Sequence, residues 1–210
     1  MEYDDTFNGS PAAGIDLLQW DEKNRAFWTE RLGRRYLLSV VPTRARKGKI
    51  LEIGAASYNK YQKDVVGWEN ELTIFDIKEP DHPDIVSIAG LDRYVRFDMT
   101  ASTAATAAPG SALTGALYGS FDEIRSWGVL SHFGFSRDQC RQYLDNVRSF
   151  LKNGGQAIFK LDRDTHKAKK YPPTITLEFL EELIRERFTI SHTDTLVGNT
   201  PGNVHYVEKR

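Results

Sequence analysis

The sequence predicts an α/β fold built on a mostly parallel β-sheet. Short apolar runs alternate with amphipathic stretches along most of the chain. Strands that alternate with helices pair in parallel and are joined by right-handed crossovers. The last two apolar runs are separated only by turn residues, a pattern typical of an antiparallel hairpin.

Seven apolar runs are the candidate strands of this sheet. The first five, which we expect to form its parallel body, are residues 50–53, 72–75, 94–97, 123–127 and 157–161. The last two, which we expect to form the hairpin, are residues 189–195 and 204–207. Apolar residues at helical spacing predict helices over 111–118, 137–151 and 176–188.

The chain is expected to contain three segments. Residues 1–14 carry Gly, Ser, Pro and Asn with little pattern, which predicts a flexible tail. Residues 15–47 carry apolar and aromatic side chains mostly at helical spacing, so they are expected to form N-terminal helices. These helices would either cover a ligand as a lid or pack as ordinary core. Residues 48–210 then form the main domain.

Composition excludes several classes of protein. The 210 residues carry a formal net charge of −1, so the chain as a whole does not attract a nucleic acid, whose phosphates dominate such binding. The single cysteine, Cys140, excludes an internal disulfide, and no Cys/His cluster has the spacing of a metal site. No apolar run approaches the roughly 20 residues that span a membrane. The acidic start is not a secretory signal, so we expect a cytoplasmic protein.

The strongest motif is an apolar strand that ends in Gly54. Residues 49–54 read Lys-Ile-Leu-Glu-Ile-Gly, so Glu52 lies near the carboxyl end of the strand. A glycine at this place lets a ligand approach the backbone closely. Ligands of open α/β sheets bind just past the carboxyl ends of the strands, at the point where the strand order reverses.

Acidic residues also end the next two strand candidates. Asp76 lies 76 − 54 = 22 positions after Gly54, close to the roughly 20 positions expected for a ribose-binding carboxylate. Asp98 ends the third strand and could accept a hydrogen bond from an adenine amino group. Acids also follow strands because they cap the next helix, and this alternative stays open for Asp98 above all.

These motifs, in this order, resemble those of the class I S-adenosylmethionine (SAM)-dependent methyltransferases. The resemblance covers about residues 48–208. It rests on residues 50–56 (ILEIGAA), Phe75 with Asp76, Phe97 with Asp98, residues 121–132 (FDEIRSWGVLSH) and residues 151–159 (LKNGGQAIF). It implies a Rossmann-like methyltransferase fold with a seven-stranded, mostly parallel sheet, and SAM as the cofactor.

The resemblance also implies roles for particular residues. Glu52 would orient the first loop, and the backbone of Gly54, Ala55 and Ala56 would lie beside the methionine part of SAM. Asp76 would hold the ribose, and Ile77 would lie beside the adenine. The remaining residues implied to contact SAM are Asp98, Met99, Ser126, Trp127 and Gly128.

Catalysis and substrate are less well defined by the sequence. His132 is the first candidate for a general base and Tyr58 the second, whereas packing is the alternative role for His132. The first loop departs from the family pattern, because Ala56 and Tyr58 occupy positions where glycine is common. We expect a small-molecule or sugar-linked acceptor, and an anionic acceptor is one of the alternatives. We expect the protein to be a monomer or a homodimer. The alternative function is a non-catalytic SAM- or nucleotide-binding module of the same fold.

Two other enzyme classes fit the sequence poorly. NAD-dependent enzymes carry Gly-x-Gly-x-x-Gly after the first strand, and no second glycine follows Gly54 at that spacing. RNA ribose methyltransferases carry a lysine at the end of the fifth strand, and Lys160 resembles it. The acid that those enzymes need after the fourth strand is absent, because Ser126, Trp127 and Gly128 stand there.

Overall fold

The computed structural model contains a seven-stranded mixed sheet with the strand order β3-β2-β1-β4-β5-β7-β6. The structure describes residues 44, 46–54, 69–77, 92–102, 116–132, 134–162, 175–196 and 202–210. The chain divides into two compact units, residues 1–96 and residues 97–210.

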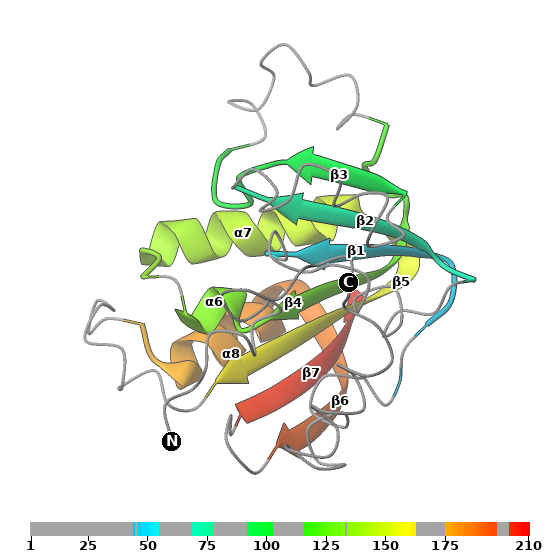
Figure 1. Ribbon diagram of the computed structural model, residues 1–210. Helices are drawn as coiled ribbons and strands as arrows, with labels where there is room; N and C mark the ends of the chain where they lie inside the picture. The colour runs from blue at the N-terminus through cyan, green and yellow to red at the C-terminus, as the bar shows by residue number, and fades with distance from the viewer. Residues whose placement is uncertain are drawn as a thin grey trace, which may run out of the picture. The chain divides into compact units, whose positions relative to one another are not determined.

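The first unit contains three parallel strands, β1 (Lys49–Ile53), β2 (Glu71–Asp76) and β3 (Arg93–Arg96) (Figure 1). In β1 and β2 every residue except the first is buried. Strands of a parallel sheet are covered on both faces, so they consist of continuous apolar runs. This burial explains why residues 50–53 and 72–75 were recognisable as strands.

Two polar contacts set the register at the start of β1 and β2. The backbone N–H of Gly48 donates to Oδ1 of Asn70 at 2.8 Å, and the N–H of Glu71 donates to the carbonyl of Gly48 at 3.0 Å. In the register that follows, Ile53 lies beside Phe75. The carboxyl ends of the two strands therefore lie next to each other.

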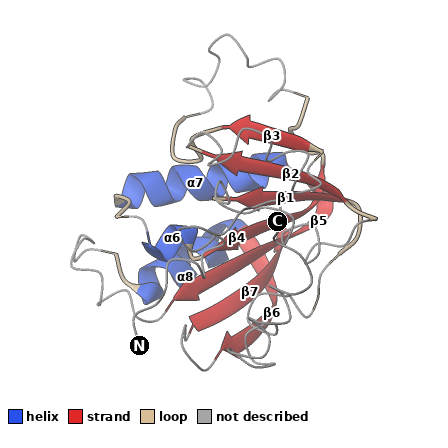
Figure 2. Ribbon diagram, in the orientation of Figure 1, coloured by secondary structure: helices blue, strands red, loops and turns tan. Residues whose placement is uncertain are grey.

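The second unit contains four strands and three helices in its described part. In chain order they are β4 (Phe121–Trp127), α6 (Val129–His132), α7 (Arg137–Phe150), β5 (Leu151–Asp162), α8 (Leu177–Arg187), β6 (Phe188–Leu196) and β7 (Gly202–Lys209). Strands β4 and β5 are parallel, whereas β7 runs antiparallel to both β5 and β6 (Figure 2). The predicted C-terminal hairpin is confirmed.

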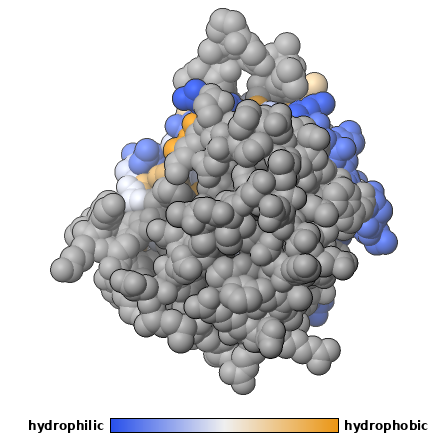
Figure 3. Space-filling view, in the orientation of Figure 1, coloured by the Kyte–Doolittle hydropathy of each residue, from blue (hydrophilic) through white to orange (hydrophobic). Residues whose placement is uncertain are grey.

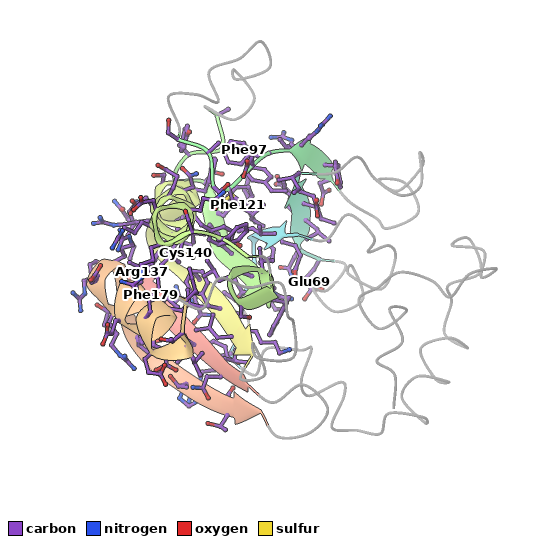
Figure 4. All side chains as sticks on the ribbon, turned by 90° about the vertical axis from the view of Figure 1, so that its left-hand side faces the viewer. Glu69, Phe97, Phe121, Arg137, Cys140 and Phe179 are labelled. Carbon is purple, nitrogen blue, oxygen red and sulfur yellow. The ribbon has the colours of Figure 1, made fainter. Side chains whose placement is uncertain are left out.

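Helices α7 and α8 lie on the same face of these four strands (Figures 1 and 2). A capping box begins α7, in which Ser136 and Gln139 bond each other's backbone N–H. The two helices meet where Arg137 of α7 lies over the ring of Phe179 of α8, 4.6 Å from its centroid (Figure 4). Packing against the strands, rather than helix propensity alone, stabilises helices of this length.

All seven predicted strands are confirmed, as are the helices predicted over 137–151 and 176–188. The helix predicted over 111–118 is wrong at its end, because residues 116–119 form a turn, and residues 111–115 lie outside the described residues. Gly119 has a φ of +63°, and the Oγ of Ser120 donates to the carbonyl of Leu117 at 2.7 Å. These contacts turn the chain into β4. The predicted tail (1–14) lies outside the described residues, as do nearly all of the predicted helices (15–47).

Strand β5 begins six residues earlier than predicted. Leu151 already pairs with Phe121 of β4, and the register shifts before Gln156 pairs with Glu123. Gly154 lies in this irregular stretch with a φ of +74°. The Leu-x-x-Gly-Gly sequence is therefore a bulge inside the strand rather than a turn before it.

The described residues visible in Figure 3 are mostly hydrophilic. Large apolar side chains with high exposure are Ile77 and Tyr118, at 54% and 39%. Among the described residues no helix is both long and apolar enough to cross a membrane.

The burial of Cys140 in α7 predicts an inert thiol. Burial raises the pKa of the Cys140 thiol to about 11, although the nearby charge of Arg141 lowers it slightly. With this pKa, about 0.1% of the thiol is deprotonated at pH 8. Only this thiolate form is nucleophilic. We expect a thiol reagent to label the folded protein at least about 100-fold more slowly than the protein unfolded in urea. Fast stoichiometric labelling of the folded protein at pH 8, followed by absorbance, would contradict this burial.

Candidate functional site

The carboxyl end of β1 combines a buried acid with a glycine in a left-handed conformation. Glu52 is 1% exposed and lies inside β1. Gly54 follows the strand directly, is exposed, and has a φ of +79°. Its N–H donates to the carbonyl of Phe75 at 2.8 Å, so the chain leaves β1 only after bonding the end of β2. Without a Cβ, Gly54 leaves backbone at this edge open to close approach.

The carboxyl end of β2 carries Asp76 and Ile77. Asp76 is the last residue of the strand and is 9% exposed. Ile77 is 54% exposed, and its carbonyl accepts a hydrogen bond from Nε of Arg96 at 3.2 Å. The first unit thus places a carboxylate and an exposed apolar side chain next to the open backbone of Gly54. This arrangement can accept bonds from paired hydroxyl groups and cover one face of a planar ring.

Asp98 and Met99 belong to the second unit. Oδ1 of Asp98 accepts from both the N–H and the hydroxyl of Thr100, at 2.8 and 2.7 Å. This oxygen therefore stabilises the turn after β3, which is a structural role of the kind that the sequence left open. Met99 is 3% exposed, and Nδ2 of Asn146 donates to its carbonyl at 2.9 Å. Contact of Asp98 and Met99 with an adenine stays a prediction.

The three residues predicted to contact SAM at the end of the fourth strand have different surroundings. Ser126 is buried, and its hydroxyl lies 2.8 Å from that of Tyr143 in α7. Trp127 follows it in the strand and therefore lies on the opposite face of the sheet. Gly128 has a φ of +71°, and its N–H donates to the carbonyl of Lys160 at 3.0 Å. Contact of these three residues with SAM stays a prediction.

The two candidate bases are not placed by the structure. His132 is the last residue of α6, and the Ser131 hydroxyl of this helix donates to the carbonyl of Gly128, the residue before the helix, at 3.1 Å. The side chain of His132 lies outside the described part, as do Tyr58, Ala55 and Ala56. Their roles stay predictions.

A buried histidine lies on the α8 face of the hairpin. His205 is 2% exposed, its Nδ1 lies 2.9 Å from the Thr193 hydroxyl, and its Nε2 lies 3.3 Å from Oε1 of Glu181. Burial lowers the pKa of His205 and outweighs the nearby carboxylate. The lowered pKa favours the neutral imidazole, which lies between the hairpin and α8. Trp127 faces the other side of the sheet, so this cluster lies apart from Trp127.

Solved structures of several methyltransferases resemble most of the chain. The N-methyltransferase NodS from Bradyrhizobium japonicum, in complex with S-adenosylhomocysteine (SAH), matches with 19% identity and a TM-score of 0.55 over 91% of this chain and 90% of that one. The 1,6-didemethyltoxoflavin N1-methyltransferase of Burkholderia thailandensis, with SAH bound, matches with 15% identity and a TM-score of 0.59 over 90% and 83%. The chain has the class I SAM-dependent methyltransferase fold.

A third solved structure that resembles the chain is that of the PH0226 protein from Pyrococcus horikoshii, with 14% identity and a TM-score of 0.59 over 93% and 94% of the two chains. No protein-family model matches the sequence, and no curated protein does. Identities this low show a shared fold. They leave the acceptor to be inferred from this chain's own residues.

Sequence reasoning missed one buried polar cluster in the methyltransferase fold. Nε of Arg125 lies 2.6 Å from Oε1 of Glu123, and both side chains are 0% exposed. Nε2 of Gln156 donates to the other oxygen of Glu123 at 3.2 Å. The sequence contains a signal for this cluster, because Glu123 and Arg125 stand two residues apart, and therefore on one face, in an otherwise largely apolar strand. Among the described residues no group of three His, Cys, Asp or Glu side chains could hold a metal ion.

The positive φ of Gly54 predicts a cost for any side chain there. We expect Gly54→Ala to lower the free energy of unfolding by about 1 kcal/mol, and Gly54→Asn by less, because Asn tolerates the left-handed conformation better. Gly119→Ala is a positive control and should lower the free energy of unfolding by a similar amount, because Gly119 has a similar φ of +63° and open space around its missing Cβ. Urea denaturation measures all three. A Gly54→Ala protein as stable as the unchanged one would show that the turn is not held as described.

Proposed function

We propose that the chain is a SAM-dependent methyltransferase that acts on a small-molecule or sugar-linked acceptor. The observation that supports this most is the shared edge of β1 and β2, where Gly54 and Asp76 lie at the carboxyl ends of paired strands. Two solved structures of the same fold carry SAH, the demethylated form of SAM. The residues at this edge fit a nucleoside, because they offer a carboxylate, open backbone and an exposed apolar side chain.

Each residue of the first unit has a proposed task. Asp76 accepts hydrogen bonds from the two ribose hydroxyls, and Ile77 covers the adenine. Gly54 admits the methionine part to the backbone, and Glu52 keeps the end of β1 in place from within the strand. Contacts of Asp98, Met99, Ser126, Trp127 and Gly128 with SAM rest on the resemblance.

The chemistry asks little of the protein's side chains. Bound SAM supplies a methyl group on a positively charged sulfur, ready for direct displacement. The chain's own residues have to hold the acceptor in line with the methyl group and exclude water. Orienting two reactants in this way supplies much of the rate enhancement of such a reaction. Trp127 contributes a large apolar surface at the end of β4 for this purpose. His132 is proposed as the group that accepts a proton from the acceptor.

A non-catalytic module of the same fold is the competing function. The glycine-poor loop after Gly54 favours it, because Ala56 and Tyr58 stand where the family usually has glycine. Turnover of SAM to SAH with candidate acceptors separates the two functions. A chain that binds SAH but turns over no acceptor of the proposed classes is a binding module.

Removing the Asp76 carboxylate tests the proposed nucleoside site. We expect Asp76→Ala to weaken SAH binding by about 1–3 kcal/mol, because hydrogen bonds to a charged group are lost. Glu71→Ala is the matched control, since Glu71 is a half-exposed acid at the opposite end of the same strand. Isothermal titration calorimetry measures both variants.

Two outcomes of this titration would contradict the proposal. If the unchanged protein binds neither SAM nor SAH at millimolar concentration, the chain is not a SAM-dependent enzyme. If both variants bind SAH equally well, Asp76 does not hold the ribose.

A further inference from the structure

The strand registers of the second unit place Trp127 and Lys160 side by side. Trp127 of β4 pairs with Lys160 of β5, Lys160 pairs with Val204 of β7, and Val204 pairs with Asp194 of β6. Residues paired in this way share one face of a sheet. The face is the one opposite α7, because Ser126, the neighbour of Trp127, contacts α7 instead. Trp127 and Lys160 are both half-buried.

Trp127 is held in place by a buried cluster of side chains on its face of the sheet. Ile158, Val204 and Tyr206 form a buried cluster, and Trp127 packs against that cluster. A large aromatic surface held in this way can bind a ring or an apolar group without further loss of side-chain freedom. Asp194, at the far end of the row, accepts a hydrogen bond from the Tyr206 hydroxyl at 2.9 Å and lies 2.8 Å from Nε2 of His192.

Arg125 adds a second positive charge one row deeper than Lys160. It lies two residues before Trp127 in β4 and pairs with Ile158, so it is a diagonal neighbour of Lys160 on the same face. Its side chain is 0% exposed, and Glu123 engages its Nε. Within the described part of the chain its Nη1 and Nη2 atoms have no hydrogen-bond acceptor.

A buried guanidinium with two unfilled donor groups is unfavourable by itself. Desolvation of a charged donor is costly unless a hydrogen-bond acceptor replaces the lost water. A planar guanidinium matches the geometry of a carboxylate or phosphate, and an ammonium such as that of Lys160 adds a strong point charge. Two cations next to a fixed indole therefore match a ligand that joins an anionic group to a ring or apolar group.

We propose that Lys160 and Arg125 bind an anionic group of the methyl acceptor, a carboxylate or a phosphate, and that Trp127 packs against the adjoining ring or apolar part. This inference rests on the proposed methyltransferase function and names the class of its acceptor. Lys160 is the specificity-determining residue, because it is only half-buried, unlike Arg125, and lies near the carboxyl end of β5. Arg125 supports the same charge from within the sheet.

Simple probes test this inference in the SAH-saturated protein. Benzoate and phenyl phosphate carry the two anions on the same ring, and benzamide is the neutral counterpart. We expect at least one of the two anionic probes to bind about tenfold or more tightly than benzamide, as expected for a hydrogen bond to a charged partner. The stronger of the two shows which anion the acceptor carries. Ligand-observed NMR or calorimetry measures the affinities.

Two lysine variants identify the residue responsible. We expect Lys160→Met to reduce binding of the anionic probe about tenfold and to leave benzamide binding unchanged. Lys152→Met is the matched control, because Lys152 lies at the other end of β5 and forms an ion pair with Asp122. It should change neither affinity. Arg125→Gln should also weaken binding of the anionic probe. Because Arg125 is buried, its substitution can also disturb the fold, so the Lys160 variant decides the test.

The outcomes separate this inference from the function on which it rests. SAH affinity is measured first in every variant, and loss of SAH binding by the unchanged protein would overturn the proposed function. If SAH binds normally but no probe shows a preference for negative charge, or if Lys160→Met keeps that preference, the anionic acceptor is overturned alone.

Discussion

The carboxyl edge of the first unit is joined by a hydrogen bond from the N–H of Gly54 to the carbonyl of Phe75 at 2.8 Å. It joins the ends of β1 and β2, and from this bond Gly54 turns the chain away with a φ of +79°, which side chains disfavour. The bond keeps Asp76, the residue after Phe75, at the same edge as the open backbone of Gly54. The proposed nucleoside site at this edge rests on this backbone arrangement, and Asp76 is proposed to supply its charge.

The strands were predictable because their pattern is physical and local. Parallel strands are buried on both faces, so the runs around Ile50 and Leu72 are continuously apolar. The hairpin was equally readable from its turn residues. The irregular start of β5 was not, because Leu151 pairs with Phe121, a contact between residues 30 positions apart that no local pattern contains. The role of Asp98 could not be predicted either, since a carboxylate after a strand can bind a ligand or stabilise its own turn. In the structure, one of its oxygens accepts hydrogen bonds from Thr100.

The second unit uses the two faces of its sheet differently. On one face, Ser126 contacts Tyr143 of α7, and His205 lies beside Glu181 of α8. On the other face, Trp127 and Lys160 lie at the strand ends above the buried Arg125. Strand alternation gives every second residue to each face, so one short segment, residues 125–127, provides both structural and candidate ligand-binding side chains. The Glu-x-Arg-x-Trp sequence could have signalled this division, but only the register shows that Lys160 joins it.

A crystal structure of the protein with bound SAH tests the proposed nucleoside site most directly. We expect both ribose hydroxyls to lie within hydrogen-bond distance of the Asp76 carboxylate, with the ligand crossing the backbone of Gly54. A ribose bound elsewhere, or Asp76 turned away from it into the protein, would contradict this site.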